Sequence, residues 1–121
     1  MDLKFYFDSN GDPRARCPAR YDLLGQFLES DIQGSVDFCR EILEKVVEIT
    51  KGIIDYREVT FNAHTLVLFP RTACIEPLFG DASESLKIPI VQFKQVLEDW
   101  KTFLISQTGD GEQKRKNRFK G

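Results

Sequence analysis

The stretch that decides the fold is residues 35–52, SVDFCREILEKVVEITKG, which has the clearest helical pattern in the chain. Its apolar residues recur near the 3.6-residue period, and charged residues fill the opposite side. Lys51 and Gly52 supply a basic last residue and a glycine stop. The pattern predicts an amphipathic helix that covers a hydrophobic core. The apolar positions are Val36, Cys39, Ile42, Leu43, Val46, Val47 and Ile49.

Two serines compete for the start of this helix. Ser30 is followed three residues later by Gln33, which fits the capping box. Ser35 is the rival N-cap, and Gly34 between them makes the first turn uncertain.

After the helix, the pattern changes from the helical period to short β-type runs. Residues 56–61 and 64–69 predict two strands around a turn at 62–63, and residues 72–76 predict a third after Pro70 and Arg71. Residues 79–85 predict an acidic loop. Residues 86–88 predict a short extended piece, because Pro89 disfavours helix at Ile88.

Before the helix, residues 3–17 predict a β-hairpin with an exposed basic face. Its strands flank Asn10 and Gly11, which provide the positive φ that a tight turn needs. Residues 18–30 fit either a strand or a short helix, and Gly25 weakens both interpretations. A last helix is predicted over 91–105 from a second apolar stripe that includes Phe93, Trp100 and Phe103.

The order of hairpin, helix, meander and helix predicts an α+β fold. We expect a small antiparallel sheet, built from the hairpin plus the meander, packed against a central helix and a C-terminal helix. Residues 1–107 form the single domain in this prediction. Residues 108–121 have no hydrophobic period, and we expect them to be a disordered basic tail.

Composition and charge restrict the class of protein. Of 121 residues, 41% are hydrophobic and 30% charged, which is ordinary globular composition. Residues 1–109 carry 12 basic and 17 acidic side chains, whereas the remaining 12 residues carry a net charge of +3. An acidic body repels nucleic acid and attracts basic partners. The chain lacks a long apolar run and a signal-peptide pattern, so we expect a cytoplasmic protein without membrane contact.

No motif of catalysis or cofactor binding is present. The chain has no nucleophile elbow, phosphate-binding loop or dinucleotide fingerprint. His64, its one histidine, is more often a hydrogen-bonded structural residue than a catalytic one. The calcium-loop spacing of Asp8, Asn10 and Asp12 lacks the required bidentate glutamate. The expectation is a non-enzyme without cofactor or metal. The three cysteines, whose spacing fits no zinc motif and which we expect to be reduced, are Cys17, Cys39 and Cys74.

Carboxylates on loops are the candidate binding residues. Such groups can pair with the lysines and arginines that line the RNA site of a nuclease, and these contacts steer association. Solvated loop charges without a partner are the commoner interpretation of the same pattern. The candidate partner-binding residues are Glu29, Asp31, Glu76, Asp81 and Glu84.

Several of these pieces, in this order, resemble the YacL-like family of small bacterial proteins. The resemblance spans about residues 2–107, and it implies no established activity and no catalytic residue. It rests on Asp2-x-x-Phe5, Asp8-x-x-Gly11, GQF at 25–27, His64-x-Leu66-x-Leu68, Ser85, Leu86, Phe93, Val96 and Phe103. The phrases FLESDIQ at 27–33 and NAHTL at 62–66 are similar to small acidic immunity proteins encoded beside secreted toxins. That similarity implies binding and blocking of one toxin domain, and the basic tail belongs to neither pattern.

The sequence thus favours a non-enzymatic, immunity-type protein that neutralises a cognate bacterial toxin, with a nuclease as the favoured class, by occluding its active site. The alternative is a housekeeping YacL-like interaction module with an unknown partner. An enzyme that uses His64 and a carboxylate is the third hypothesis. The oligomeric state stays open.

Overall fold

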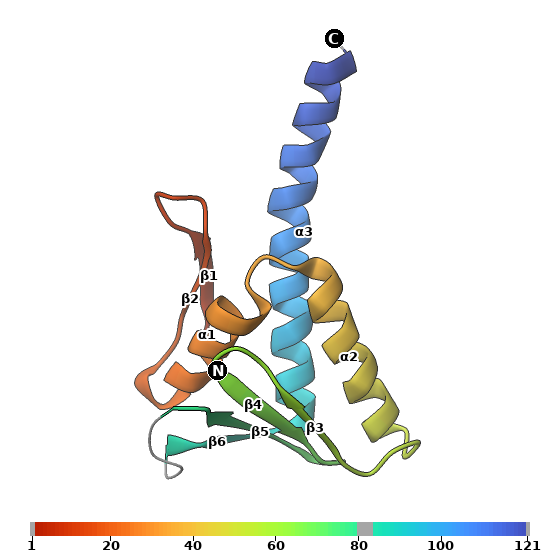
Figure 1. Cartoon of the computed structure of the whole chain (residues 1–121). Helices are drawn as coiled ribbons and strands as arrows, with labels where there is room; N and C mark the ends of the chain where they lie inside the picture. The colour runs from red at the N-terminus through yellow and green to blue at the C-terminus, as the bar shows by residue number, and fades with distance from the viewer. Residues whose placement is uncertain (1, 80–83, 121) are drawn as a thin grey trace.

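The computed structural model of the chain describes residues 2–79 and 84–120, with side chains up to Ser106. It confirms the α+β fold class, with helices on one side of an antiparallel sheet (Figure 1). The strands are β1 (Lys4–Phe7), β2 (Pro13–Arg16), β3 (Arg57–Thr60), β4 (His64–Leu68), β5 (Thr72–Pro77) and β6 (Leu86–Pro89). The helical elements are η1 (Ala19–Tyr21), α1 (Asp22–Phe27), η2 (Leu28–Ile32), α2 (Val36–Thr50) and α3 (Ile90–Lys120).

The strands form two separate antiparallel sheets rather than the one that we expected. The predicted hairpin is β1 paired with β2, and the predicted meander extends to four strands in the order β3-β4-β5-β6. The extended piece at 86–88 is thus a full strand, paired with β5. The β1–β2 hairpin packs on α3 through aromatic side chains and does not join the four-stranded sheet. Phe5 lies with its ring centroid 4.9 Å from that of Trp100, and Phe7 stacks on Phe103 at 4.6 Å.

The core lies between the four-stranded sheet and helices α2 and α3 (Figure 1). The amphipathic prediction for α2 is confirmed, because its apolar stripe is buried and its charged residues face outward. Trp100 of α3 is fully buried, and its indole N–H donates to the Gln33 carbonyl at 3.1 Å. The fully buried sheet residues that meet the helices are Leu66, Leu68, Ala73 and Ile75.

The segment that the sequence left open between strand and helix is helical. Helix α1 continues into a π-helical turn over Leu28–Ile32. A tight turn follows, in which Ser35 N–H donates to the Ile32 carbonyl and Gln33 adopts φ 56°. This conformation belongs to the first central position of a type II′ turn, where glycine is usual. Bonds from Gln33 Nε2 to the Ser30 carbonyl at 2.7 Å and from Trp100 to Gln33 hold it in place.

Ser35, not Ser30, caps helix α2. Its hydroxyl oxygen accepts a hydrogen bond from Phe38 N–H at 3.0 Å. The capping-box prediction at Ser30 and Gln33 is wrong, because those residues belong to the π-helical turn and the turn after it. At the other end, Gly52 adopts the predicted left-handed stop, with φ 77°.

Helix α3 is longer than predicted. It begins at Ile90 and its backbone continues past Ile105 to Lys120, through the segment that we expected to be a disordered tail. Glutamate, glutamine, lysine and arginine, which follow Gly111, are good helix formers, whereas Gly109 and Gly111 before them are not. The boundary between a domain over 1–107 and a tail over 108–121 stays a prediction.

Replacing Gly52 with alanine tests the stop of helix α2. An added Cβ would meet no atom within 4 Å, so the substitution acts through the positive φ alone. We expect Gly52→Ala to lower the free energy of unfolding by about 1 kcal/mol. Chemical denaturation measures it. Gly34→Ala is the matched control, because Gly34 is not among the positive-φ residues and its nearest neighbour is Pro13 Cγ at 4.0 Å. An equal loss in both variants would contradict the conformational explanation.

Candidate functional site

The candidate site is the face of the four-stranded sheet that points away from the helices, here called the open face. Side chains alternate along β4, so Leu66 and Leu68 enter the core while Thr65 and Val67 point to the opposite side. Figure 1 shows α2 and α3 on one side of this sheet. In the described part of the chain, no helix lies across the other side.

Strand register arranges the open face in three rows. The middle row crosses all four strands and joins an acidic end to a basic end, with two small buried residues between them. The next row ends on the carboxylate of Glu76, beside two threonines whose hydroxyls lie 3.3 Å apart. The middle row is Glu58, Val67, Cys74 and Lys87, and the next row is Thr60, Thr65 and Glu76.

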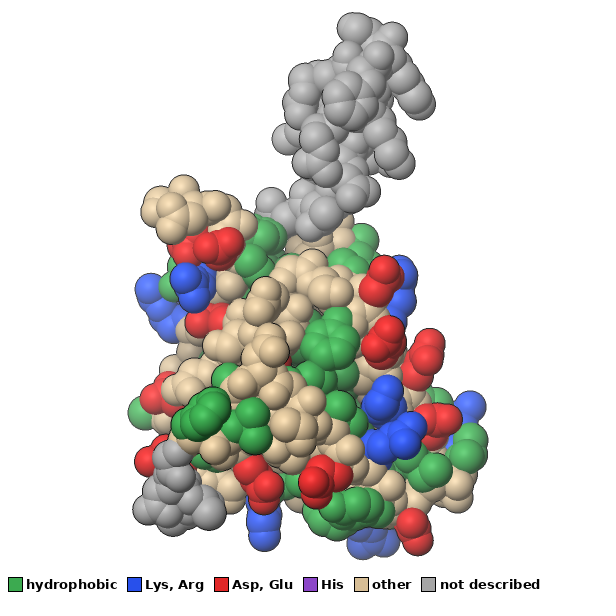
Figure 2. Space-filling model, viewed as in Figure 1, with side chains coloured by type: hydrophobic (Ala, Val, Ile, Leu, Met, Phe, Trp, Pro, Cys, Tyr) green, Lys and Arg blue, Asp and Glu red, His purple; other side chains and the backbone are tan. Residues whose placement is uncertain are grey.

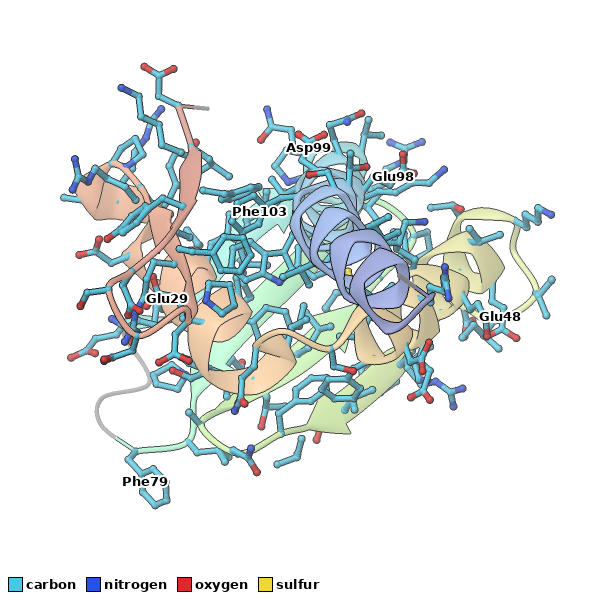
Figure 3. All side chains as sticks on the ribbon, turned by 90° about the horizontal axis from the view of Figure 1, so that it is seen from above. Glu29, Glu48, Phe79, Glu98, Asp99 and Phe103 are labelled. Atoms are coloured by element: carbon cyan, nitrogen blue, oxygen red, sulfur yellow. The ribbon has the colours of Figure 1, made fainter. Side chains whose placement is uncertain are left out.

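Aromatic residues form the third row. Tyr56 and Phe69 lie edge to face with ring centroids 5.5 Å apart, and they remain 50% and 41% exposed. Leu78 extends the outward alternation of β5 and is 39% exposed. Phe79, which follows it, is 83% exposed and points away from the domain in Figure 3. The face thus offers accessible apolar area as well as charge.

The two carboxylates of the open face act on the same phenol. The Tyr56 hydroxyl donates to Glu58 Oε1 at 2.7 Å, and this hydrogen bond is the main reason that the pKa of Tyr56 is raised. Partial desolvation and the charges of Glu58 and Glu76 raise this pKa further. Glu58 is therefore the carboxylate in contact with this exposed aromatic ring, and Glu76 stands on the same face, on the other side of β4.

Of the five predicted binding residues, Glu76 is exposed on the open face, and Glu84 is exposed just before β6. Asp81 lies outside the described residues. Glu58 was missed, although it stands in the predicted strand 56–61. The signal was present in the predicted turn at 62–63, since pairing across that turn brings Glu58 to the same face as Glu76.

Asp31 is buried, so the prediction that it contacts a partner is wrong. Its side chain has no exposed area. One carboxylate oxygen accepts the Ala63 N–H at 2.9 Å, and the other lies 2.6 Å from His64 Nδ1. The His64 ring is buried too, with the residue 2% exposed. This pair connects the π-helical turn to the first residue of β4, and such hydrogen bonding agrees with the structural interpretation of His64.

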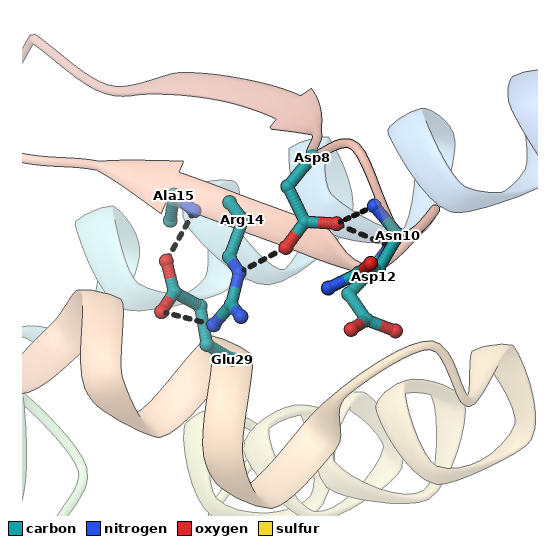
Figure 4. Close-up of polar contacts among 6 residues, drawn as sticks. All are labelled: Asp8, Asn10, Asp12, Arg14, Ala15 and Glu29. Carbon is teal, nitrogen blue, oxygen red and sulfur yellow. Dashed lines mark hydrogen bonds and ion pairs between the residues drawn. The ribbon is translucent and has the colours of Figure 1, made fainter.

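Glu29 is engaged inside the molecule as well (Figure 4). It accepts the Ala15 N–H at 2.7 Å and lies 3.4 Å from Arg14, whose Nε donates to Asp8 at 2.9 Å. The Arg14 hydrogen bond, helped by the backbone N–H groups of Asp12 and Asn10, lowers the pKa of Asp8. This network fixes the hairpin to η2, so the Glu29 carboxylate is already used within the fold.

The Asp8 carboxylate holds the turn that Asn10 and Asp12 form. Asp8 Oδ1 accepts the N–H groups of Asn10 at 2.9 Å and Asp12 at 3.0 Å. Within residues 2–79 and 84–106, no group of three or more potential ligands could hold a metal ion. Nor does a helix in the described ranges combine the length and apolarity needed to cross a membrane.

A second surface, the groove between α2 and α3, carries charges of both signs. Figure 2 shows acidic and basic side chains mixed on the side of the molecule where α2 runs. The lining includes Arg40, Glu44, Glu48, Lys94, Glu98 and Lys101. Such a mixed surface matches a basic partner less well than the open face does.

Comparison of the chain with protein-family models, with curated proteins and with solved structures finds no match.

Truncating Asp31 tests its structural role. We expect Asp31→Ala to lower the free energy of unfolding by about 3 kcal/mol, because it leaves His64 and the Ala63 N–H buried without their partner. Glu76→Ala, on the exposed face, is the control and is expected to change it by less than about 0.5 kcal/mol. Equal effects in urea denaturation would show that Asp31 is not a structural residue.

The cysteines should resist alkylation in the folded protein. Burial is the main cause that raises the pKa of Cys17 and Cys39 to about 11 from an ordinary 9.0. At pH 8 this lowers the thiolate fraction about a hundredfold. We therefore expect iodoacetamide labelling, followed by mass spectrometry, to be slow for both residues before denaturation and fast after it. Rapid labelling of folded Cys39 would contradict the buried position.

Proposed function

We propose that this chain is a non-enzymatic, protein-binding protein of the immunity type. It neutralises a cognate toxin, with a nuclease as the favoured class, by covering the toxin's active site. The observation that carries the proposal is the open face, where half-exposed aromatic rings lie beside Glu58 and Glu76 lies further along the same face of the sheet. No cofactor enters this function.

The chemistry of the open face supports a basic protein partner. Aromatic residues with large accessible area are common anchors of binding energy at interfaces. Carboxylates around such an anchor steer a positively charged partner during encounter and pair with its lysines and arginines on contact. The phosphate-binding groups of a nuclease supply that positive charge. Lys87 is the basic end of the middle row, opposite its acidic end at Glu58. The charges along this row therefore favour one orientation of the partner across the sheet.

The housekeeping alternative uses the same face with a different partner. It predicts a gene without a toxin-bearing neighbour and no protective effect in growing cells. The enzyme hypothesis has less support, since the His64 ring is almost inaccessible and its hydrogen bond to Asp31 ties two structural elements together.

Co-expression with the toxin domain of the neighbouring gene tests the proposal. We expect the wild-type chain to protect cells and to form a stoichiometric complex that survives about 0.5 M salt, where weak surface pairing is screened. Glu58→Lys combined with Glu76→Lys should weaken the complex by about thirtyfold or more and abolish protection. Calorimetry measures the affinity.

A matched control carries the same charge change on another surface. Glu41→Lys combined with Glu44→Lys alters two exposed residues of α2 and should leave affinity within about threefold. Absence of both complex and protection would reject the immunity function and leave the housekeeping module. Equal losses in the two double variants would show that the open face is not the binding surface.

A further inference from the structure

The two edges of the four-stranded sheet differ in their capacity to bind another strand. An edge strand presents unpaired backbone groups that can pair with a further chain. In an antiparallel sheet, every second residue of a strand bonds to the strand on one side, and the residues between bond to the other side. This alternation identifies the residues whose backbone groups point outward from an edge strand. The hydrogen bonds at the β3–β4 turn and at the β4–β5 turn show which residues of each strand bond to which neighbour, and this alternation holds across the sheet.

On the β3 side, the outward groups belong to Glu58 and Thr60. Phe61 N–H donates to the His64 carbonyl at 2.8 Å, so Phe61, Val59 and Arg57 bond toward β4. The N–H and C=O groups of Glu58 and Thr60 therefore point away from the sheet. Both residues are exposed, and no described backbone group bonds to them on that side.

On the β6 side, proline blocks the edge. Phe69 and Thr72 exchange both hydrogen bonds, at 2.8 and 3.3 Å, which directs Cys74 toward β4 and Ala73 and Ile75 toward β6. In β6, the outward positions are then Lys87 and Pro89. Pro89 has no N–H to donate, and proline and lysine are typical protection of an edge. Of the two edges of the four-stranded sheet, as far as the described residues show, β3 is the one that offers two donors and two acceptors.

We propose that the outer edge of β3 accepts an extended segment of a partner protein as a fifth strand, with lysine or arginine side chains over the open face. This proposal rests on the proposed function for the nature of the partner, and it adds the mode of binding. Backbone bonds to Glu58 and Thr60 supply the pairing, in the manner of known strand addition.

The side chains on the open face select the residues of the added strand. Directly opposed side chains in an antiparallel pair lie about 5 Å apart, so alternate residues of the fifth strand lie next to Glu58 and Thr60. Opposite charges at such positions are favourable, and Glu76 adds negative charge two strands away. Tyr56, bonded to Glu58, provides an accessible ring at the same edge. The chemistry therefore fits a short basic strand.

Peptide titration followed by two-dimensional amide NMR tests the edge without requiring the toxin. The probes are acetylated and amidated TKVKVKT and its acidic counterpart TEVEVET. We expect TKVKVKT to shift the amide signals of Glu58 and Thr60 and to saturate in the millimolar range, about 1 mM, with at least about fivefold weaker binding of TEVEVET.

Proline variants separate pairing from charge. Thr60→Pro removes an outward N–H and leaves the bonds to β4, so the chain should keep its fold and lose at least about tenfold in affinity. Lys87→Pro makes the same change at the opposite edge and should leave binding unchanged. If Thr60→Pro does not fold, Glu58→Lys replaces it, and the preference should reverse toward TEVEVET.

Several results would overturn strand addition at β3. These are equal binding of both peptides, shifts confined to other surfaces, no binding at 10 mM (about tenfold above the expected range), or unchanged affinity in Thr60→Pro. A dimer of the free protein that dissociates in Thr60→Pro would also overturn it, because a second copy then occupies the edge. Failure here, with a stable toxin complex, leaves the proposed function intact. Peptide binding without protection against the toxin rejects the function alone.

Discussion

The carboxylate of Asp31 is the contact on which the arrangement of the fold depends. It holds the π-helical turn to the start of β4 through His64 and the Ala63 N–H, deep between helix and sheet. A buried polar group is stable only when its hydrogen bonds are complete, so both elements must approach in one geometry. Since β4 pairs with both β3 and β5, this contact joins the helical segment to the interior of the sheet.

Local patterns predicted the elements well, because they depend on neighbours in the chain. The stripe of α2, the hairpin turn at Gly11 and the stop at Gly52 follow from periodicity and φ preference. The sequence left the cap open between Ser30 and Ser35, since the capping box does not reveal a π-helical turn. The place of Asp31 depends on a partner 33 residues away and has no local sign in the sequence.

The candidate site was predictable only in part, and the reason is register. Glu76 was placed at the end of a predicted strand, but the pairing of that strand, which gives Glu76 its neighbours, was not predictable from the local pattern. Glu58 is recognisable as a binding residue only once β3 is paired with β4, because this pairing places Tyr56 and Glu76 on the same face of the sheet. Glu29, by contrast, lost its role as a surface charge through a contact with Arg14, 15 residues earlier in the chain. Acidity along the chain is therefore a poor guide to acidity on a surface.

The π-helical turn over Leu28–Ile32 also affects which changes of chain length this fold tolerates. Such a turn holds one residue more than the α-helix around it. Removing one residue there would narrow the turn to ordinary α-helical geometry and displace the residues that follow it relative to α1. Asp31 would then leave its place beside His64, although no apolar residue of the core had changed. Homologues of this chain should accordingly conserve the spacing between GQF at 25–27 and Asp31 more strictly than the identity of the residues between them.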